Sequence, residues 1–140
     1  GERRELSVRS LRETTKPSFW MIIKWKRLYL VLEPGGKRNT EDVEFTRRKG
    51  GLVCRAREQK GTLLTRAGWK SSSDVTGVLN TLSSADFSLQ FAVYPDSYPQ
   101  FIKVRNLFRD KGYAWNWYPI QSAEQDLGLG PGKATVQGGN

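Results

Sequence analysis

The chain has 140 residues and carries a formal net charge of +9 at pH 7. It contains no histidine and one cysteine, Cys54, which excludes histidine-based acid–base catalysis, an internal disulfide and a thiolate-rich zinc site. With 37% hydrophobic and 11% aromatic residues, a chain of this length is expected to form one domain with a modest core. We predict that the protein is not an enzyme and uses no cofactor or metal.

The positive charge is concentrated in the first half of the chain. Residues 1–70 hold 18 Lys and Arg against 8 Asp and Glu, whereas residues 71–140 hold 5 against 6. A basic half beside a neutral half indicates a positive face, which can meet nucleic acid, acidic lipid headgroups or an acidic protein. The alternative is a solvated surface whose charge serves only solubility.

The chain begins with a charged segment followed by an apolar one. Residues 1–18 are predicted to be a basic N-terminal arm, mobile or forming a short helix that ends before Pro17. Residues 19–33 are rich in β-branched and aromatic side chains, and the turn signal at residues 34–36 follows, so we expect one long strand or two strands. Continuous alternation would place on one face the side chains of Ile23, Trp25, Tyr29 and Val31.

The middle of the chain is expected to contain short elements. Residues 37–50 are charged and are predicted to be a connection, whereas residues 52–57 and 62–65 are predicted to be strands. A helix is expected over Ser73 to Leu82, because capping residues precede it. Its apolar stripe has helical spacing and consists of Val75, Val78, Leu79 and Leu82.

The second half has the clearest pattern. Residues 87–94 and 113–118 alternate as strands do, and a helix from Ser97 to Lys111 separates them, with Asp96 or Ser97 as its cap. The two strands are expected to be parallel, because a helix crosses over between them. The apolar stripe of this helix consists of Phe101, Val104, Leu107 and Phe108.

These elements predict an α+β fold: a single domain with a mixed β-sheet, a C-terminal βαβ unit and two main helices. The domain is expected to cover residues 19–120. Residues 121–140 are rich in glycine and are predicted to form a tail that is ordered only if it docks. No transmembrane helix is predicted, because the most apolar run is interrupted by lysine and arginine and is too short to span a bilayer.

Aromatic and basic residues interleave in the first strand region, which suggests a candidate binding face. Aromatic rings on a sheet can stack on bases while lysine and arginine hold phosphates. The alternative is that Trp25 and Tyr29 face the core and the lysines solvate the other side. Tyr113, Trp115 and Trp117 lie in an uncharged stretch, which favours core or an interface there. The candidate face comprises Trp20, Lys24, Trp25, Lys26, Arg27, Tyr29, Arg47, Arg48 and Lys49.

The second half also resembles a known layout. The run FAVYPDSY at residues 91–98 is followed by an ordered set of residues that resembles a loosely characterised group of bacterial proteins, with a strand, a Pro-Asp turn, a helix, a second strand ending near Trp-x-Pro and a Gly-rich tail. Residues 28–32, followed by Pro34-Gly35-Gly36, would be the matching first strand. The set consists of Phe101, Arg105, Gly112-Tyr113, Trp115 and Trp117-Tyr118-Pro119.

That group is similar to the periplasmic domains of the ExbD and TolR proteins, small α+β domains that are anchored by one transmembrane helix and act with proton-driven membrane motors. The resemblance implies a periplasmic location, with membrane contact only through a segment outside this sequence; otherwise a cytoplasmic location is expected. No functional residue is carried over from it. We therefore expect a non-catalytic binding or assembly module with a protein partner, as the extracytoplasmic domain of a membrane-anchored motor or envelope complex. The alternative is a nucleic-acid-binding protein that uses the basic first half.

Overall fold

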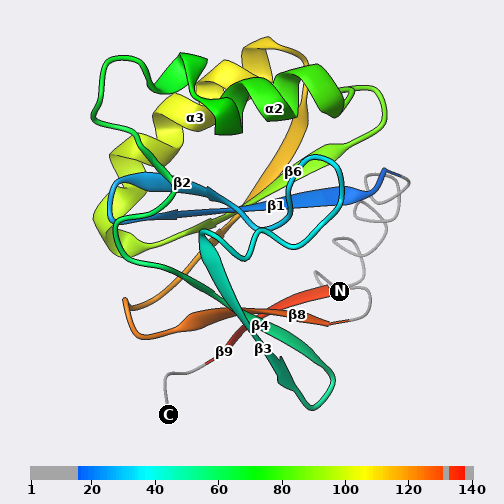
Figure 1. Ribbon diagram of the computed structural model, residues 1–140, viewed down its shortest axis with the longest axis vertical. Coiled ribbons are helices and arrows are strands. Elements are labelled where there is room, and N and C mark those ends of the chain that lie inside the picture. The colour runs from blue at the N-terminus through cyan, green and yellow to red at the C-terminus, as the bar shows by residue number, and fades with distance from the viewer. Residues whose placement is uncertain (1–15, 131–132, 138–140) are drawn as a thin grey trace, which may run out of the picture.

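Two stacked β-sheets and a layer of helices make up the protein, seen in a computed structural model that describes residues 16–130 and 133–137. Helices α2 and α3 cover one side of the mixed sheet, and an antiparallel sheet covers the other (Figure 1). The mixed sheet has the order β5-β2-β1-β6-β7. Its strands are β1 (Ser18–Lys24), β2 (Arg27–Leu30), β5 (Thr62–Leu63), β6 (Ser88–Val93) and β7 (Ala114–Pro119).

The antiparallel sheet has the order β3-β4-β8-β9. Short 3-10 turns η1 (Trp69–Ser71) and η2 (Pro95–Ser97) precede helices α2 (Ser73–Thr81) and α3 (Tyr98–Asp110). The expected single α+β domain with a mixed sheet, two main helices and a βαβ unit is confirmed, since β6 and β7 flank α3 and pair in parallel. The strands of the antiparallel sheet are β3 (Val43–Arg48), β4 (Gly51–Ala56), β8 (Asp126–Gly130) and β9 (Lys133–Gln137).

The structure differs from the predicted organisation in the charged connection, in the Gly-rich tail and at the end of the N-terminal arm. The charged connection at residues 37–50 contains a strand, β3, so that prediction is wrong over Val43–Arg48. The Gly-rich segment from 121 to 140 is also not simply a tail, because β8 and β9 complete the antiparallel sheet and Leu127 is buried. Of the predicted arm, residues 1–15 lie outside the described residues, and Ser18 already belongs to β1.

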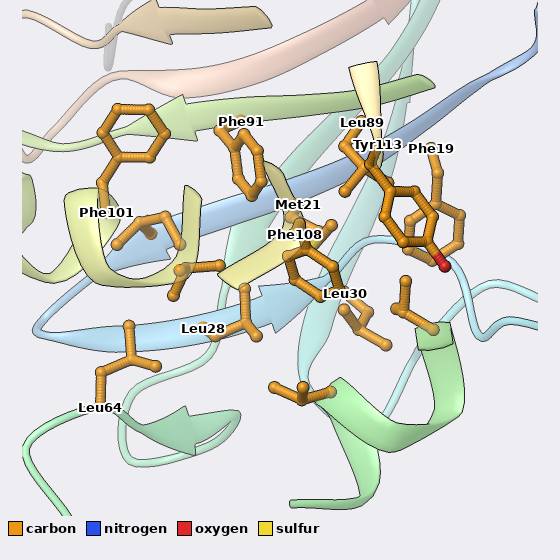
Figure 2. Close-up of a cluster of buried hydrophobic side chains, with 14 of the residues drawn as sticks. Phe19, Met21, Leu28, Leu30, Leu64, Leu89, Phe91, Phe101, Phe108 and Tyr113 are labelled. Carbon is orange, nitrogen blue, oxygen red and sulfur yellow. The ribbon is translucent and has the colours of Figure 1, made fainter. Parts of the chain in front are cut away.

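The first core lies between the helices and the mixed sheet (Figure 2). Three of the four residues in the predicted α3 stripe, Phe101, Val104 and Phe108, are buried there, and Leu107 packs partly buried against them. A second core lies between the two sheets, where Val43, Cys54 and Leu127 of the antiparallel sheet meet Ile22 and Ala92 of the mixed sheet. Both faces of β1 and β6 are therefore covered, which explains why β6 is buried at every position.

The turn between β1 and β2 changes which residues share a face. Trp25 and Lys26 form a two-residue turn with positive φ angles of 54° and 59°, and Ile23 pairs with Leu28 across it. Ile23 therefore faces the helices, whereas Tyr29 faces the antiparallel sheet. The prediction that Ile23 shares a face with Tyr29 and Val31 is wrong, because alternation does not run through a tight turn. The glycine or asparagine that usually marks such a turn is absent.

Asp96 and Ser97 hold this turn in place instead of capping α3. Both carboxylate oxygens of Asp96 lie 3.2 Å from the backbone nitrogen of Trp25, and the hydroxyl of Ser97 accepts a 2.7 Å bond from the backbone N–H of Lys26. Ser97 at the start of α3 makes no capping bond with its side chain. Ser97 does occupy the N-cap position of α3, but the predicted capping bond is absent, because the β1–β2 turn engages the same side-chain oxygens.

We expect Lys26→Gly to raise the free energy of unfolding by up to about 1 kcal/mol. The left-handed conformation costs a residue with a Cβ about 1–2 kcal/mol, which exceeds the entropy of up to about 1 kcal/mol that a glycine loses on folding. Lys26 is exposed and its backbone N–H is kept. Urea denaturation compares this variant with Lys37→Gly, an exposed lysine without a positive φ, which should lower stability. Equal losses in both variants would show that the turn is not strained.

Candidate binding surfaces

The structure does not bring the nine residues of the candidate face together. Lys24 and Tyr29 are buried, at 4% and 0% exposed. Trp20 is half-buried and packs against the ring of Tyr118 at 5.0 Å. The remaining residues lie in two separate places, as the strands of Figure 1 show: Trp25, Lys26 and Arg27 at the β1–β2 turn, and Arg47, Arg48 and Lys49 at the end of the β3–β4 hairpin.

Lys24 ties the first strand to the segment before β8. Its Nζ donates a 2.9 Å hydrogen bond to the carbonyl of Ala123 and lies 4.4 Å and 4.3 Å from the ring centroids of Trp25 and Tyr94. Burial lowers the pKa of this ammonium, although nearby carboxylates, Asp126 foremost, oppose the shift. The two aromatic faces stabilise the charge that water no longer solvates. Lys24 is therefore a structural clasp and not part of an exposed basic face.

A groove of about 690 Å³ opens beside this clasp, between the β1–β2 turn and the antiparallel sheet. Its central feature is a paired contact in which the guanidinium of Arg55 meets both carboxylate oxygens of Asp126, at 2.8 and 3.1 Å. The walls carry equal numbers of opposite charges, so the groove has no net preference for an anion or a cation. Its ionisable lining residues are Lys24, Glu44, Arg55, Arg57, Glu58, Lys60, Glu124 and Asp126.

The exposed large hydrophobic side chains of the described residues lie on the edge strand β7 and at the start of α3. Trp117 is 38% exposed, Tyr118 39% and Tyr98, at the start of α3, 47%. The ring of Trp117 stacks on buried Phe101 at 5.4 Å and lies 5.5 Å from the ring of Tyr98. The buried ring of Phe101 therefore contacts all three rings of an aromatic patch, which we define as Tyr98, Trp115 and Trp117.

The backbone of β7 offers unpaired groups on its outer side. The N–H of Ile120 donates to the carbonyl of Val93 on β6 at 2.9 Å. Because N–H and C=O groups alternate sides along a strand, those of Asn116 also point toward β6, and those of Trp115 and Trp117 point away from the sheet. Among residues 16–130 and 133–137, β7 is the last strand of its sheet and no backbone bond is made to these outward groups, so they can pair with another chain.

Sequence reasoning found part of this surface. The uncharged stretch around Trp115 and Trp117 favours core or an interface, and the structure places these side chains half-buried and exposed, respectively. The position of β7 at the edge could not be read from the sequence, because strand order depends on long-range pairing. The sequence did contain one signal for an interaction surface here, which is the complete lack of charged residues from 112 to 123.

Other kinds of site are not visible in the part of the chain that the structure describes. Residues 16–130 and 133–137 contain no group of three or more side chains suited to hold a metal ion. Within the same residues, no helix is long and apolar enough to cross a membrane. The chain matches no family model, no curated protein and no solved structure.

Proposed function

We propose that the chain is a non-catalytic assembly module that receives an extended protein segment alongside β7. The observation that carries this proposal is an open edge strand with outward amides at Trp115 and Trp117 and no charged residue from 112 to 123. In such binding, main-chain hydrogen bonds supply affinity and alternate side chains supply specificity.

The absence of charge on this edge supports a binding role. Proteins usually protect exposed edges with lysine, proline, bulges or a covering element, because an open edge invites pairing with another chain. Within β7 itself, the one such device is Pro119, its last residue. An unprotected edge flanked by Trp117 and Tyr98 is therefore an interaction surface, since partly exposed aromatic residues are the commonest source of binding energy at interfaces.

The proposed role agrees with the resemblance to ExbD and TolR domains, which implies assembly with other proteins in the cell envelope. On that basis the domain acts in the periplasm, as the extracytoplasmic part of a larger complex. The partner is a protein that presents a strand, and the domain contributes no chemistry of its own.

Peptide selection tests this function. Random twelve-residue peptides are selected against the full chain, and the tightest binders are measured by fluorescence anisotropy. Trp117→Lys places a charge on the edge and removes an aromatic anchor, so its Kd should rise about 30-fold, as expected for a hot spot of about 2 kcal/mol. The matched control Thr65→Lys adds an exposed lysine beyond β5, at the opposite edge of the sheet, and should bind unchanged.

Two results would overturn the assembly role. One is a selection that yields no binding peptide. The other is a set of peptides that bind wild type and Trp117→Lys equally well, which would place their site elsewhere on the molecule.

Nucleic-acid binding is the second candidate, supported by the contiguous exposed residues Arg47, Arg48 and Lys49 at the end of the β3–β4 hairpin. If this tip contacts phosphates, replacing all three with glutamine should lower the log–log salt slope of binding by up to about three. Anisotropy with labelled DNA and RNA at two salt concentrations measures it. No binding at about 50 mM salt, where phosphate contacts are only weakly screened, would reject this candidate.

A further inference from the structure

We propose that the segment received by β7 is the β7 strand of a second copy of this chain, paired antiparallel about a twofold axis at Asn116. This inference rests on the proposed function, because it requires β7 to accept a strand. It goes further by naming the partner and the register.

The arrangement of backbone donors along the outer side of β7 supports this pairing. The N–H groups of Trp115 and Trp117 point outward, as the Ile120–Val93 bond fixes by alternation. On either side of them the outward donor is missing, because the N–H of Tyr113 already bonds the carbonyl of Phe108 and Pro119 has no N–H. Outward N–H donors are therefore missing at Tyr113, free at Trp115 and Trp117, and missing at Pro119. This order is the same when the strand is followed in the opposite direction.

An antiparallel copy matches this pattern with itself. Centred on Asn116, the pairing sets Trp115 of each chain opposite Trp117 of the other, and each such pair exchanges two N–H to C=O bonds. Four main-chain hydrogen bonds form, and no free donor faces a blocked position, since Tyr113 meets Pro119. The two mixed sheets then become one continuous sheet across the dimer, in an isologous contact.

The side chains are compatible with the same register. Trp115 and Trp117 both lie on the side of β7 that packs against Phe101, so the two aromatic patches meet across the axis and cover each other. Aromatic cross-strand pairs stabilise antiparallel strands. The twofold axis sets the two Asn116 side chains directly opposite each other.

Electrostatics allows two copies to meet here despite a net charge of +9. The segment from 112 to 123 carries no charge, so no like charges are forced together along the strand. A different protein that recognises a basic chain would be expected to use acidic groups, and this edge offers them no cation within the strand. Beside the strand, the guanidinium of Arg105 on α3 lies 5.2 Å from the ring centroid of Trp115, so the contact along β7 itself is between neutral segments and one arginine of each copy flanks it.

A charge-exchange experiment tests the register. Residues directly opposite in a non-hydrogen-bonded antiparallel pair have Cα atoms about 4.5 Å apart, so Asn116→Asp sets two carboxylates together and Asn116→Lys sets two ammonium groups together. Each variant alone should raise the dimer Kd at least about 30-fold in sedimentation of the full chain. A 1:1 mixture of the two should restore dimers, because opposite charges then face each other.

The controls separate this inference from folding and from the broader function. Asn80 is an exposed asparagine on α2, and its Asp and Lys variants should dimerise like wild type. A wild-type chain that stays monomeric up to about 1 mM, or a dimer that persists in both Asn116 variants, would overturn the twofold pairing. If selected peptides still require Trp117 in that case, the assembly role stands and only the second copy fails. If the chain does not dimerise through Asn116 and the selected peptides do not require Trp117, both the twofold pairing and the assembly role are rejected.

Discussion

Truncating Phe101 to alanine is expected to lower the free energy of unfolding by about 3–5 kcal/mol. The side chain is 1% exposed and packs against the ring of Phe91 at 5.3 Å and that of Trp117 at 5.4 Å. Its removal leaves a cavity between α3 and the mixed sheet, and neighbouring side chains fill such a space only in part. Since small domains are stable by only about 5–15 kcal/mol, this loss is a large fraction of the total.

Urea denaturation followed by circular dichroism measures the effect. Ile102→Ala is the matched control, because Ile102 is the next residue of α3 but is only partly buried against the same cluster, and its truncation should cost less. A loss below about 1 kcal/mol for Phe101→Ala, outside the range for a buried phenylalanine, would contradict the packing described between α3 and β7. Peptide binding should also weaken in Phe101→Ala, since Trp117 loses the ring on which it stacks.

Alkaline conditions are expected to destabilise the protein steeply between pH 9 and 12. Burial raises the pKa of Tyr29 to about 12 and that of Cys54 to about 11, from reference values of 10.0 and 9.0. In this window the unfolded chain releases protons that the folded chain retains, so the free energy of unfolding falls as pH rises. Each shift corresponds to a loss of about 3 kcal/mol. Lys24 acts in the opposite direction: burial lowers its pKa, so the folded chain releases this proton more readily than the unfolded chain and the cost of burying the ammonium is relieved as pH rises.

Chemical denaturation at a series of pH values tests this expectation with Tyr29→Phe. At pH 7 the variant should be less stable by about 1 kcal/mol, because the hydroxyl of Tyr29 donates a 2.8 Å bond to the carbonyl of Arg57. Above pH 10 its stability should fall less steeply than that of wild type. Tyr98→Phe removes an exposed hydroxyl and serves as the control. Equal slopes in wild type and Tyr29→Phe would show that the hydroxyl of Tyr29 reaches water.

The βαβ unit was predictable because its signals are local. Alternation in β6 and β7 and helical spacing from Phe101 to Phe108 each lie within one element, and Gly112, with a φ of 93°, ends the helix as its position suggests. Parallel pairing then follows from the connection alone. The same reasoning located α2 to within a residue.

Of the antiparallel sheet, β4 matches the strand predicted at residues 52–57, whereas β3, β8 and β9 were not predicted, because these strands are identified only by their partners. In β3 Glu44, Arg47 and Arg48 are charged and exposed, so Val43 and Phe45 provide too weak an alternation to stand out. In β8 glycine takes two of the five strand positions. On the paired strand β4, a Cβ on Gly51 would lie 2.3 Å from the carbonyl oxygen of Leu129. Backbones this close favour glycine, which sequence reasoning associates with tails.

The nine residues predicted to form a basic face do not lie together, again because their positions depend on the complete fold and not on the local pattern. Interleaving of lysine and tryptophan in one segment indicates a face only if the segment is a single strand. A tight turn at Trp25 and Lys26 divides it. The antiparallel sheet covers Tyr29, and the segment before β8 contacts the buried Lys24. The edge position of β7 depends on a strand order that only the complete fold defines.

The position of β8 also determines when the protein can finish folding during its synthesis. All the buried residues of the core beneath the helices have been made once Tyr113 emerges from the ribosome. The core between the sheets must wait for Leu127, which pairs with Cys54 far earlier in the chain. Until then β4 has a free edge, and the apolar underside of the mixed sheet lacks part of its cover. A nascent chain paused in this interval is at its most prone to aggregate and has the greatest need of a chaperone.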